Sequence, residues 1–383
     1  MRFFNVCFIF LFVLMLALPL VFVDSKLDRV SVTENRMLAN RPSFAEIKNS
    51  PGMFIRQFDD WFKDSTGFRE KLLTIYKVIN ENKWVNNVVR YTEGGNVYLI
   101  GEKGHRYFAG VTGHLIPKFQ GKQFLSDEQL SGMARKLEEV KAYLESKGIP
   151  LIVMFGTDKE SIYPEYYPKS IKRGTDPIQL DIITNYLKKH TSVDIFNIRQ
   201  ALLAEKKSYL LYYKTTTTIE LSIFAHYNEI GAFFAYRELM KHINTYFPQI
   251  VAYKLDDIEI NYDEKEIPNV HLKQGFTYKR LDPSFFDNVD VLRPFTWQNH
   301  AYENMNPNLP VILFLCDSYA SWEQYIGKYI AQQFGKATFI HYSNIRNIQE
   351  YINQFKPDII VFESAERDLG GFAYYVSTIP ELP

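Results

Sequence analysis

A short apolar run that ends abruptly at polar residues constrains this chain more than any other feature. Residues 311–315 read Val-Ile-Leu-Phe-Leu, and Cys316, Asp317 and Ser318 follow at once. A β-branched and aromatic run with polar boundaries predicts a buried strand, and open α/β folds bind ligands at the carboxyl edge of such strands. Ser318 is therefore either a nucleophile, if a histidine reaches it, or part of a helix cap with Asp317.

The rest of the chain alternates between strand and helix patterns, which predicts an α/β fold with a parallel sheet and helices on both faces. The segment 250–298 reads as irregular, with room for antiparallel strands. Strands are expected at 97–100, 151–155, 193–196, 311–315, 338–340 and 359–362, and helices at 51–83 (interrupted at Gly67), 126–148, 177–189, 228–243, 321–334 and 347–355.

Composition excludes several classes of function. The 44 basic residues balance 44 acidic ones, so no basic face predicts nucleic acid as a partner. The two cysteines, Cys7 and Cys316, fit neither a disulfide scaffold nor a metal-ligand spacing. We find no phosphate-binding glycine loop and no haem motif, and therefore expect neither a metal nor a cofactor.

The N-terminus predicts the compartment. Residues 3–23 are apolar apart from Asn5, and about 20 such residues span a bilayer as a helix. Arg2 precedes them, so the N-terminus should stay in the cytoplasm. A cleaved signal peptide is the alternative, but the apolar core is long and no clean cleavage site follows. We expect residues 1–24 to be a single inner-membrane anchor, and residues 25–383 to form a domain in the periplasm or outside the cell.

A histidine just before a predicted helix is the second chemical feature. His226 precedes Asn228, which could cap that helix. The residue is either an ordinary loop histidine or the base that Ser318 requires.

Several stretches, in order, resemble the alginate O-acetyltransferase group, the AlgX/AlgJ-like branch of the SGNH-hydrolase-like proteins. The resemblance runs from about Arg29 to Leu369, and each piece is weaker than the order and spacing of the whole. The matching stretches are 33–39 with Pro42, 61–64 with 67–69, 101–104, Lys159 with 162–165 and Pro168, 211–215, 226–236, 317–319, 356–358 and 366–367.

The resemblance implies an SGNH-hydrolase-like domain that is a serine-dependent acyltransferase. Ser318 would attack an acyl donor while His226 removes its proton, and the acyl group would pass to a sugar hydroxyl. The family implies a polysaccharide acceptor outside the cytoplasm, such as an exopolysaccharide. It also implies a multi-pass membrane O-acyltransferase as the supplier of acetyl groups.

The histidine motif departs from the family, which has Asp-x-His-Trp-Asn. Phe224 stands at the position of the acid, Tyr227 replaces the tryptophan, and the segment that precedes His226 is longer. Glu220, in that longer segment, is the better substitute acid. Asp317 is the other, although neighbouring side chains on an extended strand point to opposite faces. The glycine turn also departs, because residues 105–107 read His-Arg-Tyr in place of Trp-Leu-Phe.

The remaining candidates are substrate contacts, each with a structural alternative: Lys159, Tyr319, Asn228 and Arg367. Lys159 could equally be solvated, Asn228 could be only a cap, and Arg367 could belong to an ion pair with Glu366. The altered motif leaves three functions open. They are an O-acetyltransferase, an inactive glycan-binding or scaffold subunit of an acetylation system, and a carbohydrate acetyl esterase.

Overall fold

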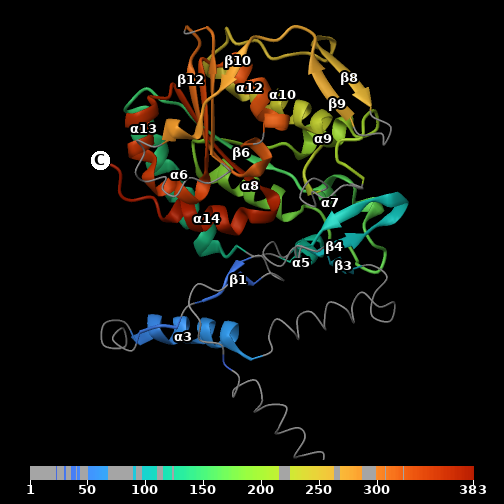
Figure 1. Ribbon diagram of the computed structural model, residues 1–383, viewed down its shortest axis with the longest axis vertical. Helices are drawn as coiled ribbons and strands as arrows, with labels where there is room; N and C mark the ends of the chain where they lie inside the picture. Colours follow the sequence, from blue (N-terminus) through green and yellow to red (C-terminus); the bar gives the residue numbers. More distant parts are fainter. Residues whose placement is uncertain are drawn as a thin grey trace, which may run out of the picture. The chain divides into compact units, whose positions relative to one another are not determined.

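The chain forms two compact units, residues 1–100 and 101–383, in a computed structural model (Figure 1). The structure describes residues 23, 30–31, 36–39, 41–43, 51–67, 89–91, 97–109, 115–122, 125–214, 225–262, 268–286, 299–306, 308–321 and 323–383. The anchor predicted at residues 3–23 lies outside these residues except for Val23. Among the helices that the structure describes, none has the length and apolarity needed to cross a membrane.

The first unit contains one long described helix, α3 (Pro51–Ser65), and short antiparallel strands. The backbone amide of Ala39 donates to the Asp64 carboxylate over 2.8 Å, and Arg41 lies 5.5 Å from the Trp61 ring. The helix ends before Gly67, where its predicted interruption stood, and residues 68–88 lie outside the described part. The strands are β1 (Val30–Ser31), β2 (Arg36–Met37), β3 (Val89–Tyr91) and β4 (Val97–Ile100).

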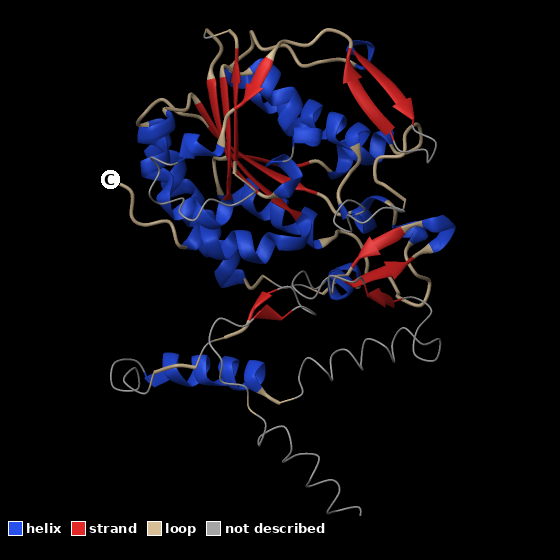
Figure 2. Cartoon of the chain, viewed as in Figure 1, coloured by secondary structure: helices blue, strands red, loops and turns tan. Residues whose placement is uncertain are grey.

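The second unit is built on a seven-stranded sheet, and its central strands are parallel as the alternating pattern predicts (Figure 2). Two antiparallel strands complete one edge. In spatial order the strands are β10 (Tyr278–Arg280), β11 (His300–Asn304), β13 (Lys336–His341), β12 (Val311–Cys316), β14 (Ile359–Ala365), β6 (Leu151–Gly156) and β7 (Asp194–Asn197).

Helices cover both faces of this sheet, because its strands are apolar on both sides (Figure 1). Ile312 and Phe314 belong to one buried cluster, with α10 (Glu229–Tyr246) and α12 (Lys328–Gln333). Leu313 and Leu315 belong to the opposite one. The helices on that second face are α6 (Asp127–Glu145), α8 (Gln179–His190), α13 (Ile348–Phe355) and α14 (Leu369–Ser377).

Local signals in the sequence correspond to observed elements. Ser126 and Gln129 form the predicted capping box at the start of α6. The irregular segment contains an antiparallel pair, β8 (Ile258–Tyr262) and β9 (Pro268–Leu272). Other short elements are β5 (Arg106–Phe108), α5 (Leu115–Phe119), α7 (Lys159–Ile162) and α9 (Arg199–Glu205).

One predicted helix, 321–334, forms differently. It is divided into α11 (Ser318–Ser321), a π-helical turn (Glu323–Gly327) and α12. Tyr325 leaves helical geometry inside the turn (φ −109°, ψ −132°), and its buried ring stacks on His226 at a centroid distance of 5.7 Å. The aromatic contact and the break in the helix therefore coincide.

Candidate active site

Ser318 lies where the central sheet ends. Strand β12 ends at Cys316, and Ser318 is the first residue of α11. The amide of Ser321 donates to the Asp317 carbonyl over 3.1 Å and closes this turn. Because β12 lies between β13 and β14, the half-buried serine stands at the middle of the carboxyl edge.

His226 reaches Ser318, although 92 residues separate them in the sequence. Its Nε2 lies 2.7 Å from the Ser318 Oγ, which is hydrogen-bonding distance for a nucleophile and its base. Only 4% of His226 is exposed, and its ring contacts Tyr319 at 4.8 Å as well as Tyr325. The two residues that the sequence singled out are thus adjacent.

The Asp317 side chain stabilises the turn at Ser318 and does not orient His226. Its Oδ1 accepts from the Tyr319 amide and its Oδ2 from the Ala365 amide, both over 2.8 Å. No hydrogen bond joins Asp317 to His226, as the alternation of side chains along an extended strand predicts. Loss of solvent raises the pKa of Asp317. The candidacy of Asp317 as substitute acid is therefore corrected to a positioning role.

A residue that the sequence reasoning missed lies beneath this turn. Glu363 on β14 is fully buried, and its Oε2 accepts from the Asp317 amide over 3.2 Å. Burial and the neighbouring Asp317 carboxylate raise the pKa of Glu363 well above its usual value. A glutamate that continues the apolar run 359–362 was the available signal, because a carboxyl group seldom continues a buried strand without a role.

The backbone before His226 is held by an ion pair. Arg367 contacts Asp158 at 2.8 Å through Nε and at 2.7 Å through Nη2, and it also donates to the Ala225 carbonyl and the Tyr319 hydroxyl. The Tyr319 hydroxyl donates to the same Ala225 carbonyl over 2.7 Å. Arg367 and Tyr319, expected as substrate contacts, therefore use their polar groups to hold the histidine segment.

The backbone after His226 is held just as firmly. The Tyr227 hydroxyl donates to the Tyr319 carbonyl. The Asn228 Oδ1 accepts from the amides of Ile230 and Gly231 at 3.1 and 3.0 Å, and its Nδ2 donates to the Leu210 carbonyl over 2.6 Å. Asn228 is fully buried, so it caps α10 and is not free to contact a substrate.

Lys159 is also a structural residue, which corrects its expected contact with substrate. Its ammonium donates to the carbonyls of Arg106, Tyr213 and Lys214 at 2.7, 2.5 and 3.2 Å, and the residue is 2% exposed. Burial lowers its pKa to about 7. Three carbonyl acceptors use all three donors of an ammonium group, so Lys159 joins β5 to residues 213–214.

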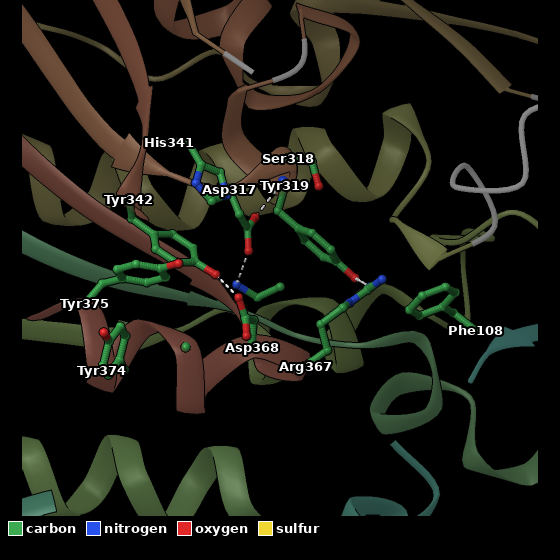
Figure 3. A pocket seen from close by; sticks show the side chains of 12 residues that line it. Phe108, Asp317, Ser318, Tyr319, His341, Tyr342, Arg367, Asp368, Tyr374 and Tyr375 are labelled. Atoms are coloured by element: carbon green, nitrogen blue, oxygen red, sulfur yellow. Dashed lines mark hydrogen bonds between the residues drawn. The ribbon is translucent and has the colours of Figure 1, made fainter. Parts of the chain in front are cut away.

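A pocket of about 540 Å³ opens beside Ser318 (Figure 3). Its described lining consists of Phe108, Asp317, Ser318, Tyr319, His341, Tyr342, Ala365, Arg367, Asp368, Gly371, Tyr374 and Tyr375. Two sides of Ser318 can be distinguished. We call Asp158, Tyr319, Arg367 and residues 225–228 the His226 side, and His341, Tyr342, Asp368, Tyr374 and Tyr375 the His341 side.

Two sequence predictions remain predictions. Glu220 and Phe224 lie in the segment 215–224, outside the described residues, so the group that orients His226 is a matter for proposal. Within the described ranges, no group of three or more His, Cys, Asp or Glu side chains could hold a metal ion.

A family model matches part of the chain. Residues 119–281 match the family model of the SGNH hydrolase-like domain of the acetyltransferase AlgX. The predicted resemblance to the AlgX/AlgJ-like family is confirmed. The match covers less than half of the chain, including His226, and ends before Ser318. No curated protein sequence matches the chain significantly.

Solved structures are similar to this chain at low sequence identity. Bacillus cereus PatB1 has 14% identity and a TM-score of 0.50, over 72% of this chain and 97% of PatB1. A DHHW family protein from Eubacterium siraeum has 13% identity and a TM-score of 0.47, over 74% of this chain and 94% of that one. The O-acetyltransferase domain of Pseudomonas putida AlgJ has 15% identity and a TM-score of 0.42, over 74% of this chain and 99% of that domain. With the family match, the PatB1 likeness identifies an SGNH-hydrolase-like α/β domain with a mostly parallel sheet.

Proposed function

We propose that this protein is an O-acetyltransferase that modifies an extracytoplasmic polysaccharide through an acetyl-Ser318 intermediate. The observation that carries the proposal is the 2.7 Å contact between His226 Nε2 and Ser318 Oγ at the edge of a pocket. The match to an acetyltransferase family supports acetyl chemistry. The polysaccharide is inferred from the resemblance to the alginate O-acetyltransferase group.

In the first half-reaction, Ser318 Oγ attacks the carbonyl carbon of an acetyl ester. His226 Nε2 takes the hydroxyl proton and returns it to the oxygen of the departing alcohol, which leaves acetyl-Ser318. In the second half-reaction, a sugar hydroxyl attacks the acetyl carbonyl. His226 takes its proton and returns it to Ser318 Oγ, so the sugar carries the acetyl group and the enzyme is regenerated.

A donor for the negative oxygen of each tetrahedral intermediate comes from the turn itself. The amides of Asp317, Tyr319 and Ser321 already donate to Glu363, to the Asp317 side chain and to the Asp317 carbonyl. Among the described residues, none accepts a hydrogen bond from the Ser318 amide. We assign that N–H to the oxyanion, because donors of this kind make large contributions in acyl transfer.

Glu220 is our candidate for the acid that orients His226. The Glu220→Gln variant should lose most of its turnover, because loss of the charge of a triad acid costs roughly 10⁴-fold elsewhere. Glu205→Gln, on the described helix α9, is the control and should leave turnover unchanged. Equal turnover of the two variants would remove Glu220 from the mechanism.

The surrounding system follows from the N-terminus and the resemblance. We propose that residues 1–24 anchor the protein in the inner membrane and that residues 25–383 act in the periplasm or outside the cell. A multi-pass membrane O-acyltransferase would supply the acetyl groups. The apolar segment 3–23, preceded by Arg2, supports the anchor.

The test is acetylation of the purified full-length protein with a chromogenic acetyl ester. We expect a burst of product and an added acetyl group on Ser318 in mass spectrometry. Ser318→Ala should abolish both, with a loss of about 10⁴-fold or more in turnover. Ser321→Ala, a matched serine in the same turn, should keep the burst.

The two other functions are outcomes of the same experiments. If Ser318 takes no label, and Ser318→Ala leaves polysaccharide acetylation in cells unchanged while deletion of the chain abolishes it, the protein is a scaffold or glycan-binding subunit. If the acetyl group passes to water and never to any of a range of added sugars, it is an esterase. Either outcome would overturn the transferase proposal.

A further inference from the structure

Aromatic side chains on the His341 side of the pocket contact one another in sequence (Figure 3). The rings of His341 and Tyr342 stack at 4.7 Å, Tyr342 contacts Tyr375 at 5.8 Å, and Tyr375 contacts Tyr374 at 5.2 Å. Tyr374 is 64% exposed, although it is a large aromatic residue. Exposed tyrosines offer an apolar face with a polar edge, and sugars present the complementary combination of C–H faces and hydroxyl edges.

His341 is placed next to the nucleophile by the register of the sheet. It ends β13, and the parallel pairing sets it opposite Cys316, two residues before Ser318. His341 lines the pocket, whereas His226 is almost completely buried. The described lining of the pocket therefore contains a histidine other than His226, and the proposed acetyl transfer does not use it.

The hydrogen bonds of His341 fix the position of its proton. Its Nδ1 accepts from the Ser343 amide over 3.3 Å and lies 2.8 Å from the Ser343 Oγ. A backbone N–H can only donate, so Nδ1 is an acceptor and the neutral ring carries its hydrogen on Nε2. Burial lowers the pKa of His341, although the nearby Asp368 opposes the shift. None of the described residues accepts a hydrogen bond from Nε2.

Asp368 provides the complementary acceptor. Its Oδ2 accepts from the Tyr342 hydroxyl, and its Oδ1 has no hydrogen-bond donor among the described residues. A Cβ added at Gly371 would lie 2.5 Å from that Oδ1, so the glycine leaves room for the carboxylate. Among the described lining residues, the one cationic side chain is Arg367, and Asp158 already neutralises it.

We propose that His341 and Asp368 are the specificity-determining residues for the acetyl acceptor, and that this acceptor is an uncharged sugar. The His341 Nε2–H donates to one hydroxyl, Asp368 Oδ1 accepts from another, and the sugar ring packs on the Tyr374 and Tyr375 faces. An acidic sugar is disfavoured, because its carboxylate would meet Asp368 without a compensating cation in the described lining. The inference rests on the proposed function, since it names the acceptor of the same site.

The experiment measures how acetyl-Ser318 divides between acceptor and water. Full-length protein receives a chromogenic acetyl ester with cellotetraose as the uncharged probe or tetragalacturonic acid as the acidic probe. In the wild type we expect transfer to cellotetraose to exceed transfer to the acidic probe. In His341→Ala the ratio of transfer to hydrolysis should fall about tenfold, the size of one lost hydrogen bond to substrate.

Two conservative variants distinguish a role in sugar recognition from a structural role. His341→Gln keeps an N–H donor near the Nε2 position and should restore the ratio to within about threefold of the wild type. Asp368→Asn should narrow the preference for the uncharged probe. If His341→Ala lowers hydrolysis and transfer equally, or if the wild type prefers the acidic probe, the proposal is overturned.

The experiment also distinguishes failure of the acceptor proposal from failure of the proposed acetyl transfer. If the wild type forms no acetyl-Ser318, acetyl transfer fails, and saturation-transfer NMR on full-length Ser318→Ala then tests sugar recognition alone. The acceptor site is supported if Ser318→Ala gives a cellotetraose signal, if the further substitution His341→Ala abolishes it, and if His341→Gln in the same background keeps it. The absence of a signal with Ser318→Ala, or one that is equal in all three proteins, contradicts it.

Discussion

The two sides of Ser318 differ in how their polar groups are used. On the His226 side, Arg367, Tyr319 and Asn228 have their side-chain polar atoms bonded to other protein groups. On the His341 side, the His341 Nε2 and the Asp368 Oδ1 have no partner among the described residues, and Tyr374 is exposed. On the His226 side most polar groups are bonded internally, with the buried Asp158 Oδ2 as an exception among the described residues, whereas the His341 side presents open polar groups.

This difference indicates that the groups for catalysis and the groups for substrate recognition lie on separate sides of Ser318. A base must keep its ring within hydrogen-bonding reach of the nucleophile, which requires neighbours that are themselves fixed. A binding surface must instead keep donors and acceptors for its ligand. Lys159, Asn228, Tyr319 and Arg367 looked like ligand contacts in the sequence, and they belong to the internally hydrogen-bonded framework.

The largest expected effect within this framework comes from Arg367. Arg367→Ala leaves Asp158, which is 2% exposed, as an uncompensated buried charge, and such losses cost about 3–5 kcal/mol of stability. It also removes one of the two hydrogen bonds to the Ala225 carbonyl, next to His226, so turnover should fall more than binding. Urea unfolding and ester kinetics measure the two effects. Arg346→Ala, at an exposed position, should change neither.

Adding Asp158→Asn to Arg367→Ala should recover part of the stability, because no buried charge is then left unpaired. If Arg367→Ala is as stable and active as Arg346→Ala, the His226 side does not depend on this ion pair and the comparison fails.

The next largest expected effect is a pH dependence of the free energy of unfolding, and it comes from Glu366, which contacts the Asp158 backbone. Glu366 accepts from the Asp158 amide at 2.9 Å and from the Ser161 hydroxyl at 2.8 Å. Burial, with the Asp158 charge, raises its pKa from 4.5 to about 7. The folded state therefore binds the proton more tightly. The resulting stability is full below pH 4.5 and is lost as the pH rises to 7, a loss of about 3 kcal/mol.

Glu366→Gln should remove this component, so its stability should fall less between pH 4.5 and 7 than that of the wild type. Urea unfolding at several pH values measures the slope. Glu381→Gln, an exposed control, should retain the wild-type slope. A slope in Glu366→Gln equal to that of the wild type would show that Glu366 does not titrate in this range.

The smallest effect tests whether the helix cap serves the site. Asn228→Ala removes the cap of α10, which should cost about 1–2 kcal/mol of stability. Because Asn228 is two residues from His226, ester turnover should also fall. Ser126→Ala removes the cap of α6 and should cost similar stability with unchanged turnover. If turnover falls equally in both variants, the cap acts only through stability.

Much of the fold could be predicted from local patterns. The runs 151–155 and 311–315 became β6 and β12, and Ser126 with Gln129 formed its capping box. Strand β11 was missed because it reads His-Ala-Tyr-Glu-Asn, with little strand-like periodicity. Helix α14 was also missed, since its Gly370 and Gly371 weaken the helical signal.

The site was predicted in part. Ser318 and His226 were identified by sequence position and resemblance, whereas Glu363 and His341 were not. Glu363 follows an apolar run inside β14, and its role depends on the amide of Asp317, which directly follows the neighbouring strand β12. His341 matters because β13 pairs with β12. Neither relation leaves a trace in the local sequence.

The sequence by itself determined the α/β class, a serine at the end of a buried strand and a histidine before a helix, because periodicity, strand ends and caps are local properties. Tertiary structure decided that these residues meet across 92 positions and that four candidate contacts are framework. It also decided that the open polar groups lie on the His341 side. The physical reason is that a hydrogen bond is satisfied in space, so only the folded chain determines which polar groups remain for a ligand.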